Sequence, residues 1–361
     1  MRYSKGWARF ALGLIALGGS IQAIAQASPK PPSGLCATGV ACLSQDSSNI
    51  SLGKKWNPGH YLKTQGNAAP SVSGQQSYFN DITRQLGQTT SSNQIKGAVV
   101  LYSWGSLEPR RGQYNWAPVY SHLNYLASRG KRLIVHVETK CFRSSCPTLA
   151  PQNLQGEVVA NNSGFIVPVW RSHVMDQLIA FSNAFAAEFD NHPHIEMVGT
   201  MGENCTSFGK NTPKDYSHRA YASQVMRLQD SQSVAFKRTH VFNMINCDPG
   251  GEFAAVLENG YRRKLVRSSP DSHNEPGAML FRGRNGAVRD YRGRMPHMTY
   301  MSAPNLGGKD NLLPMSNVAR QISDLSITHV AWVSTSSSAS WKTILSMLES
   351  NQIRVTTTVR P

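Results

Sequence analysis

Residues 99–109 read VVLYSWGSLEP, residues 112–116 continue with GQYNW, and a further apolar run ends in GKRLIVHVE at residues 130–138. The order predicts a buried strand, a loop, a helix and a second buried strand. The helix presents one apolar face, made of Trp116, Tyr120, Leu123 and Ala127. This is one βαβ unit, and its second strand ends in the carboxylate of Glu138.

The rest of the chain repeats the alternation of buried strands and amphipathic helices. Polar side chains gather where such strands end, which is where parallel barrels carry their sites. We predict one α/β domain, a (β/α)8 TIM barrel. The predicted strands cover residues 59–63, 97–103, 132–138, 195–201, 240–245, 265–268, 297–301 and 328–334. The clearest helices are predicted at 170–190, 213–229 and 340–349, and the connection 270–295 shows no periodicity.

Three parts are expected along the chain: a signal peptide at 1–27, an irregular lead-in at 28–55 and the barrel at 56–361. Arg2, Lys5 and Arg9 precede an apolar run, and Ala25-Gln26-Ala27 offers a small-x-small cleavage site after Ala27. The run is too short and too rich in glycine for a membrane span. We therefore expect a periplasmic or secreted protein without a membrane span.

Six cysteines in an exported chain indicate disulfides before metal ligands. Two pairs can close locally, Cys36 with Cys42 and Cys141 with Cys146. Cys205 and Cys247 remain, each just past the end of a predicted strand, and adjacent barrel strands would bring them together. Fifteen pairings are possible in principle, so the sequence alone does not decide among them. No spacing favours the rival zinc site, and no motif indicates a cofactor.

The formal net charge is +16, of which the signal peptide supplies only three positive charges, so the mature chain stays strongly basic. Cations are dense between Tyr261 and Arg294. Export makes nucleic acid a poor partner, whereas an anionic polysaccharide or envelope surface fits a basic patch. A merely solvated basic surface is the competing explanation. The sequence does not define an oligomeric state.

The pattern W-x-x-L-E-P-x-x-G-x-Y-x-W, from Trp104 to Trp116, resembles the second-strand segment of (β/α)8 glycoside hydrolases of the β-galactosidase and cellulase type. The resemblance extends in organisation over roughly residues 56 to 350, and its second specific region surrounds Glu203. Packing aromatics of any α/β protein could produce the same pattern. The resemblance implies a glycoside hydrolase and a carbohydrate substrate.

Glu203 follows the fourth predicted strand, and His192-Pro193-His194 before that strand is similar to the fourth-strand region of those hydrolases. The resemblance implies a general acid/base at Glu203, which a raised pKa would suit. The family pattern places Asn before the acid, but here Gly202 precedes Glu203 and Asn204 follows it. A loop carboxylate in an ion pair is the alternative reading.

Glycoside hydrolysis uses a second carboxylate, and the seventh predicted strand ends without one. Asp271 at the sixth strand end is our first choice, beside His273. Glu138 at the third strand end is the second choice, and Glu275 is a third. Asp271 after a proline could instead be only a turn residue.

Aromatic side chains at strand ends are candidate platforms for sugar rings, namely Trp104, Tyr300 and Trp332. His136 shares a strand face with Glu138 and is expected at the floor of the site. With Asn204 and His273, these residues make up the predicted substrate-binding set. Each aromatic could equally be a core residue.

We therefore predict an exported glycoside hydrolase that acts on a polysaccharide or oligosaccharide, with Glu203, Asp271 and Glu138 as catalytic candidates. Two alternatives stay open. The barrel could have lost catalysis and bind glycans only, or it could be a lyase for anionic polysaccharides. An α/β-hydrolase esterase is disfavoured because no G-x-S-x-G motif is present.

Overall fold

The computed structural model describes residues 54–64, 80, 83–84, 86, 94–270, 276–302, 318–334 and 339–359. These residues belong to one compact unit, Leu43–Pro361. The predicted signal peptide, almost all of the lead-in and the pair Cys36 and Cys42 lie outside the described residues. Within the described residues, no helix has the length and apolar character that a membrane span requires.

Eight parallel strands close into a barrel, which confirms the predicted (β/α)8 fold. All eight correspond to the strands expected from the sequence, with ends that shift by no more than a few residues. The barrel strands are β1 (Gly59–Thr64), β2 (Ile95–Ser103), β3 (Arg132–Glu138), β7 (Ile195–Gly199), β8 (His240–Met244), β9 (Val266–Pro270), β10 (His297–Ser302) and β11 (His329–Ser334). Strand β1 pairs with β2 on one side and with β11 on the other, so the first and last strands complete the ring.

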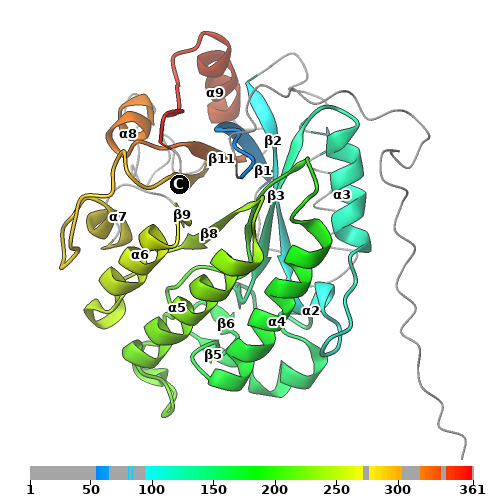
Figure 1. The fold of residues 1–361 in the computed structure, drawn as a ribbon, viewed down its shortest axis with the longest axis vertical. Helices are drawn as coiled ribbons and strands as arrows, with labels where there is room; N and C mark the ends of the chain where they lie inside the picture. The colour runs from blue at the N-terminus through cyan, green and yellow to red at the C-terminus, as the bar shows by residue number, and fades with distance from the viewer. Residues whose placement is uncertain are drawn as a thin grey trace, which may run out of the picture. The chain divides into compact units, whose positions relative to one another are not determined.

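The helices pack around the outside of the strands, as Figure 1 shows for α3 to α6. Their apolar stripes cover the barrel. The described helices are α2 (Trp104–Leu107), α3 (Ala117–Ala127), α4 (Ser172–Phe189), α5 (His218–Ala235), α6 (Phe253–Arg262), α7 (Pro276–Phe281), α8 (Val318–Asp324) and α9 (Ala339–Glu349). The expectation of an irregular connection at 270–295 is wrong at α7, a helix too short to show periodicity.

A small antiparallel sheet is inserted between β3 and α4. Its strands are β4 (Lys140–Cys141), β5 (Val159–Asn161) and β6 (Gly164–Ile166), in the order β4-β6-β5. The side chain of Asn161 and the backbone of Asn162 bond to the carbonyls of Thr206 and Ser207. The insert therefore joins the loop that follows β3 to the loop that follows β7.

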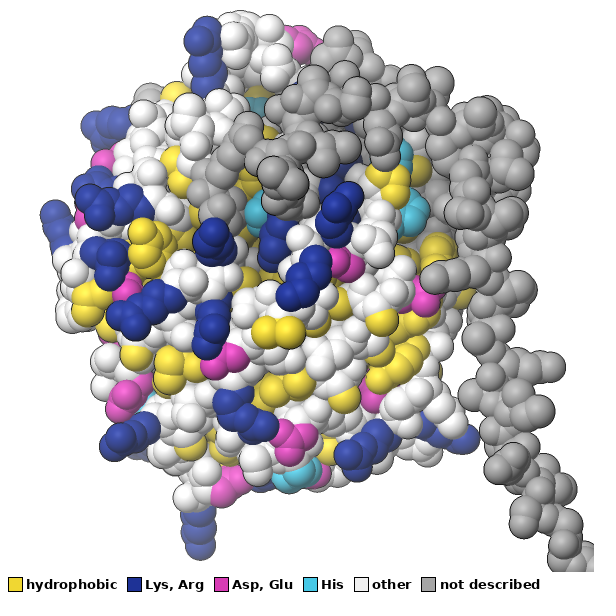
Figure 2. Space-filling view, viewed as in Figure 1, with side chains coloured by type: hydrophobic (Ala, Val, Ile, Leu, Met, Phe, Trp, Pro, Cys, Tyr) yellow, Lys and Arg dark blue, Asp and Glu magenta, His cyan; other side chains and the backbone are white. Residues whose placement is uncertain are grey.

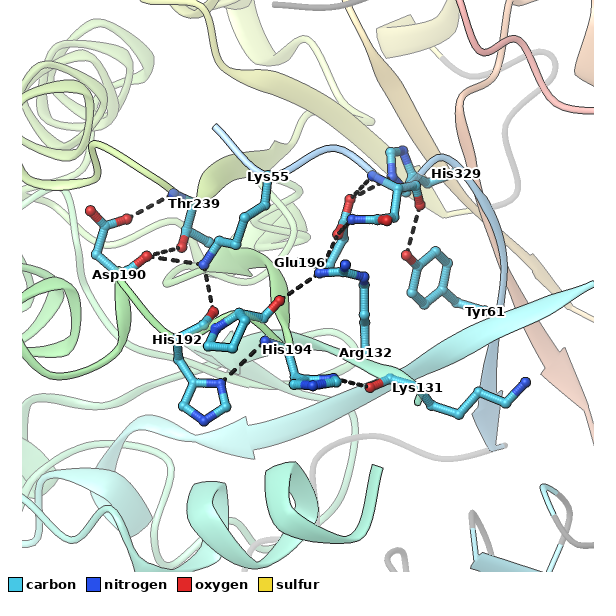
Figure 3. A network of polar contacts seen from close by, with 12 residues as sticks. Lys55, Tyr61, Lys131, Arg132, Asp190, His192, His194, Glu196, Thr239 and His329 are labelled. Carbon is cyan, nitrogen blue, oxygen red and sulfur yellow. Dashed lines mark hydrogen bonds and ion pairs between the residues drawn. The ribbon is translucent and has the colours of Figure 1, made fainter. Parts of the chain in front are cut away.

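A buried polar network occupies the amino end of the barrel (Figure 3). The carboxylate of Glu196 accepts the backbone and side-chain N–H groups of Asn57 at 2.6 and 2.8 Å, and it lies 3.3 Å from Nε2 of His329. Burial alone would raise the pKa of Glu196, but the hydrogen bond from His329 and the charge of Arg132 lower it to about 2. Glu196 is thus a structural anion that ties the segment before β1 to β7 and β11.

Lysine 55 anchors the same segment to the end of α4. Its Nζ donates to the carbonyls of Asp190 and His192 at 3.0 and 2.7 Å (Figure 3). Cations at a helix C-terminus satisfy carbonyls that lack intrahelical partners. Lys55 and Glu196 therefore have structural roles at the amino end of the barrel. Candidate catalytic residues are expected at the carboxyl end.

Candidate active site

Two predicted catalytic residues, Glu138 and Glu203, lie at the carboxyl ends of neighbouring strands. Glu138 is the last residue of β3, and Glu203 follows β7, which pairs with β3. Gly202 brings the two segments together. A Cβ atom on Gly202 would lie only 2.6 Å from Oε2 of Glu138, so the absence of a side chain leaves room for the Glu138 carboxyl group. This accounts for the glycine that stands where the resemblance predicts asparagine.

Glu138 is a buried carboxyl group, with 7% of its surface exposed. The pKa of Glu138 is raised to about 8, chiefly because burial disfavours the charged form. The charge of Lys63 acts in the opposite direction, and the nearby Glu203 adds to the rise. Glu138 therefore holds its proton at neutral pH. A carboxyl group in that state can donate a proton to a leaving group.

Glu203 has a different environment. Its Oε1 forms an ion pair with Nζ of Lys140 at 2.5 Å, and its Oε2 accepts a hydrogen bond from Nδ2 of Asn246 at 3.0 Å. The Lys140 side chain is 1% exposed and that of Glu203 is 15% exposed. The carboxyl group of Glu203 is thus held by two donors, and part of it stays at the surface. The ion-pair alternative considered from the sequence applies, although here the pair lies inside the site.

Lys140 owes its position to the small sheet. It is the first residue of β4, it also donates to the carbonyl of Cys205 at 2.7 Å, and it comes two residues after Glu138. The disulfide Cys205–Cys247 joins the loops that follow β7 and β8. These are the loops that carry Glu203 and Asn246, so the disulfide holds two contacts of the site together. The disulfide Cys141–Cys146 closes the loop after β4. Two of the three pairings considered from the sequence are therefore present, and the third, Cys36 with Cys42, lies outside the described residues.

His136 and Tyr300 form the floor beneath Glu138. The Tyr300 hydroxyl group lies 2.7 Å from Nδ1 of His136, and the same nitrogen is 3.8 Å from Oε1 of Glu138. Burial lowers the pKa of His136 to about 3, so the imidazole is neutral. Nζ of Lys63, at the end of β1, lies 5.3 Å from the centre of the Tyr300 ring. Both predicted residues therefore reach the site, but Tyr300 contributes its hydroxyl group to the floor and is only 6% exposed.

Asn204 is not placed to bind a substrate, contrary to the sequence-based expectation. Its side chain is fully buried. Both the nitrogen and the oxygen of its amide group form hydrogen bonds with the loop after β8. Nδ2 donates to the carbonyl of Cys247 at 2.6 Å, and Oδ1 accepts the N–H groups of Asn246 and Cys247 at 2.9 and 3.0 Å. Asn204 thus positions Asn246, which in turn holds Glu203.

The expectation that Trp104 and Trp332 offer sugar platforms is not supported, because both side chains are fully buried. The indole of Trp104 donates to Oε2 of Glu108 at 2.7 Å within the loop after β2. Trp332 stacks on His60 and donates to it at 3.2 Å. His60 and Lys63 are three residues apart in β1, so they point to opposite faces, and Lys63 faces the site. Trp332 therefore packs on the outer surface of the barrel.

Asp271, His273 and Glu275 lie outside the described residues, and their roles stay predictions from the sequence. Sequence reasoning also missed three residues of the cluster, Lys63, Lys140 and Asn246. The signal for Lys140 is its place two residues after Glu138, because residues two apart share a face of an extended chain, although in the structure a bend at Thr139 separates β3 from β4. Among the described residues, no group of three or more His, Cys, Asp and Glu side chains is arranged to hold a metal ion.

Five arginines of the dense basic segment form ion pairs with carboxylates. Arg262 and Arg289 pair with Glu258, and Arg263 pairs with Asp230. Arg282 and Arg292 pair with Asp324. Figure 2 likewise shows basic and acidic side chains interspersed over the visible face. Two of the three carboxylates in these pairs are shared by two arginines, so the segment keeps an excess of positive charge.

No family model matches this sequence. Solved structures similar to the chain include endo-glycoceramidase II from Rhodococcus sp., at 12% identity over 76% of this chain and 73% of that chain, with a TM-score of 0.49. The catalytic domain of a beta-amylase from Paenibacillus polymyxa shares 10% identity over 77% and 93% of the two chains, and an endogalactoceramidase shares 15% over 77% and 70%. Both have TM-scores of 0.49. Similarities at this level assign neither a reaction nor a substrate to this chain.

Proposed function

We propose that the protein is a glycoside hydrolase in which Glu138 donates the proton and Glu203 acts as the carboxylate. The observation that carries the proposal is the placement of two carboxyl groups with different surroundings at one end of the barrel. Glu138 is buried, and burial favours its protonated form, whereas Glu203 is paired with Lys140. Glycosidases need one carboxyl group of each kind, on either side of the scissile bond.

The two roles follow from the surroundings of each group. A glycosidic oxygen is a poor leaving group until it receives a proton, and Glu138 keeps a proton available at neutral pH. Glu203 has both oxygens engaged by cationic or amide donors, which fix its orientation toward a sugar carbon or a water molecule. The resemblance alone gives the acid/base role to Glu203, so this assignment exchanges the roles of the two residues.

Substrates with different leaving groups test the assignment. We expect Glu138→Gln to lower turnover of a polysaccharide by about 10²–10⁴ and to spare an aryl glycoside, whose phenolate leaves without a proton. Glu203→Gln should lose both activities. Glu349→Gln, at an exposed residue of α9, is the control. Full polysaccharide turnover in Glu138→Gln would contradict the proton-donor role.

The same assays separate the other candidate functions. A wild-type protein that binds polysaccharides without releasing reducing ends would be a glycan-binding barrel. Unsaturated products would instead identify a lyase. Binding that weakens steeply with added salt would favour an anionic glycan, because salt screens exposed charges over about 8–10 Å.

We also propose that the protein is exported, with cleavage after Ala27. The amino-terminal pattern and two disulfides among the described residues support this location. Mass spectrometry of the exported protein should give an amino terminus at Ser28. An uncleaved chain retained in the cytoplasm would refute it.

A further inference from the structure

Phe142 is unusual for its exposure and its position. Three large apolar residues are exposed in the described part of the chain, namely Phe142 at 40%, Val234 at 65% and Val288 at 67%. Phe142 is the aromatic one, and phenylalanine is among the residue types most often buried. It also comes two residues after Lys140, in the loop beside the candidate active site.

The Phe142 ring lies next to the ion pair of the site. Nζ of Lys140 is 4.5 Å from the centre of the ring, and the same nitrogen is 2.5 Å from Oε1 of Glu203. An ammonium group at this distance is attracted to the negative face of the ring. A single cation thus connects the aromatic ring to the carboxylate, while much of the ring stays in contact with solvent.

The loop that carries Phe142 is held by three features. The disulfide Cys141–Cys146 closes it, and β4 pairs with β6 so that Cys141 lies opposite Phe165. Gly164 packs directly against the loop, where a Cβ atom would lie 2.1 Å from the carbonyl oxygen of Cys141. A ring on such a support loses little freedom when a ligand binds, which favours affinity.

We propose that Phe142 is a platform that stacks on the C–H-rich face of a pyranose ring and holds it beside Glu203. Sugar C–H groups carry partial positive charge and are attracted to an aromatic face, as the ammonium of Lys140 is. Each such contact is weak, but several act together on one ring. The proposal rests on the proposed function, and it makes Phe142 a binding residue with no role in proton transfer.

Binding and turnover of Phe142 variants test the platform. The probes are a soluble β-glucan and a soluble β-galactan, with binding measured by retardation in polysaccharide-containing gels. We expect Phe142→Ala and Phe142→Leu to weaken binding about tenfold and to raise KM with little change in kcat, since a platform binds ground state and transition state alike. Phe142→Tyr should restore binding because it keeps the ring. Val288→Ala is the exposed apolar control.

The outcomes for the platform and for the proposed hydrolase are separable. Binding that depends on Phe142 in a protein that never cleaves either probe would support the platform and refute the hydrolase. Cleavage with an unchanged KM in Phe142→Ala would support the hydrolase and refute the platform. Equal binding by Phe142→Leu and Phe142→Tyr would also overturn the platform proposal, because only tyrosine keeps the aromatic ring. Wild-type protein that binds neither probe would refute a platform for these rings.

Discussion

Replacing Gly202 with alanine should remove most of the activity and leave the fold intact. The new Cβ atom would lie 2.6 Å from Oε2 of Glu138 and 3.3 Å from the backbone nitrogen of Thr139. Gly202 is not among the residues with positive φ, so alanine meets no backbone strain. The effect of the substitution therefore comes from the collision with the Glu138 carboxyl group.

The size of the effect follows from that contact. An ordinary separation of about 3.4 Å requires the carboxyl oxygen to move by about 0.8 Å. A displacement of roughly 1 Å at a catalytic group costs about 10²-fold in rate, so we expect turnover to fall by about 30- to 100-fold. Overpacking of a buried site costs about 1–3 kcal/mol, which the remaining core should tolerate.

Turnover and thermal unfolding should be measured on Gly202→Ala together with a matched glycine variant. Gly156→Ala is the control, because nothing lies within 4 Å of its new Cβ atom. Shortening the acid in the double variant Gly202→Ala/Glu138→Asp gives the carboxyl group room and should recover part of the lost rate. Wild-type turnover in Gly202→Ala would refute the placement of Glu138 in the reaction.

Three further predictions concern pH, the disulfide and the buried indole. The free energy of unfolding of the wild type, minus that of Glu138→Gln, should fall as pH rises from 4.5 to about 8. The folded protein keeps the Glu138 proton over that range, whereas the unfolded chain loses it. Denaturant titrations that give the same difference at every pH would contradict the raised pKa. Replacing Cys205 and Cys247 with serine should destabilise the protein by about 2–5 kcal/mol and lower turnover, since the two loops of the site separate; unaltered turnover would argue against that positioning. Trp104→Phe should destabilise by about 1–3 kcal/mol through the lost hydrogen bond to a buried carboxylate, with KM unchanged; a raised KM without loss of stability would restore Trp104 as a sugar platform.

The sequence predicts the barrel strands well because strands such as β2 and β3 are short runs rich in β-branched and other apolar residues. It also places Glu138 and Glu203 at the right edge, since the carboxyl ends of parallel strands meet there. Helix α7 was missed because it spans only Pro276–Phe281, less than two turns.

Side-chain direction is what the sequence does not settle. A shift of one residue in the register of a strand moves each side chain from the inner to the outer face of the barrel. The sequence therefore places Trp332 near a strand end but does not say whether it points into the barrel or out of it. Lys140 lies in an inserted sheet whose strands are two or three residues long, too short for any periodic signal, and Phe142 lies in the loop that follows its first strand. The approach of Lys140 to Glu203 depends on a contact between residues 63 positions apart.

The pairing of β1 with β11 ties the folding of this chain to its full synthesis. Gly59 lies opposite His329, so the seam of the barrel joins residues that leave the ribosome some 270 positions apart. Until the last strand is available, β1 and β10 each keep an unpaired edge, and Glu196 lacks the imidazole of His329. Nascent chains that stop before β11 should therefore expose strand edges that attract other chains, and closure of the ring should be a late, slow step of folding.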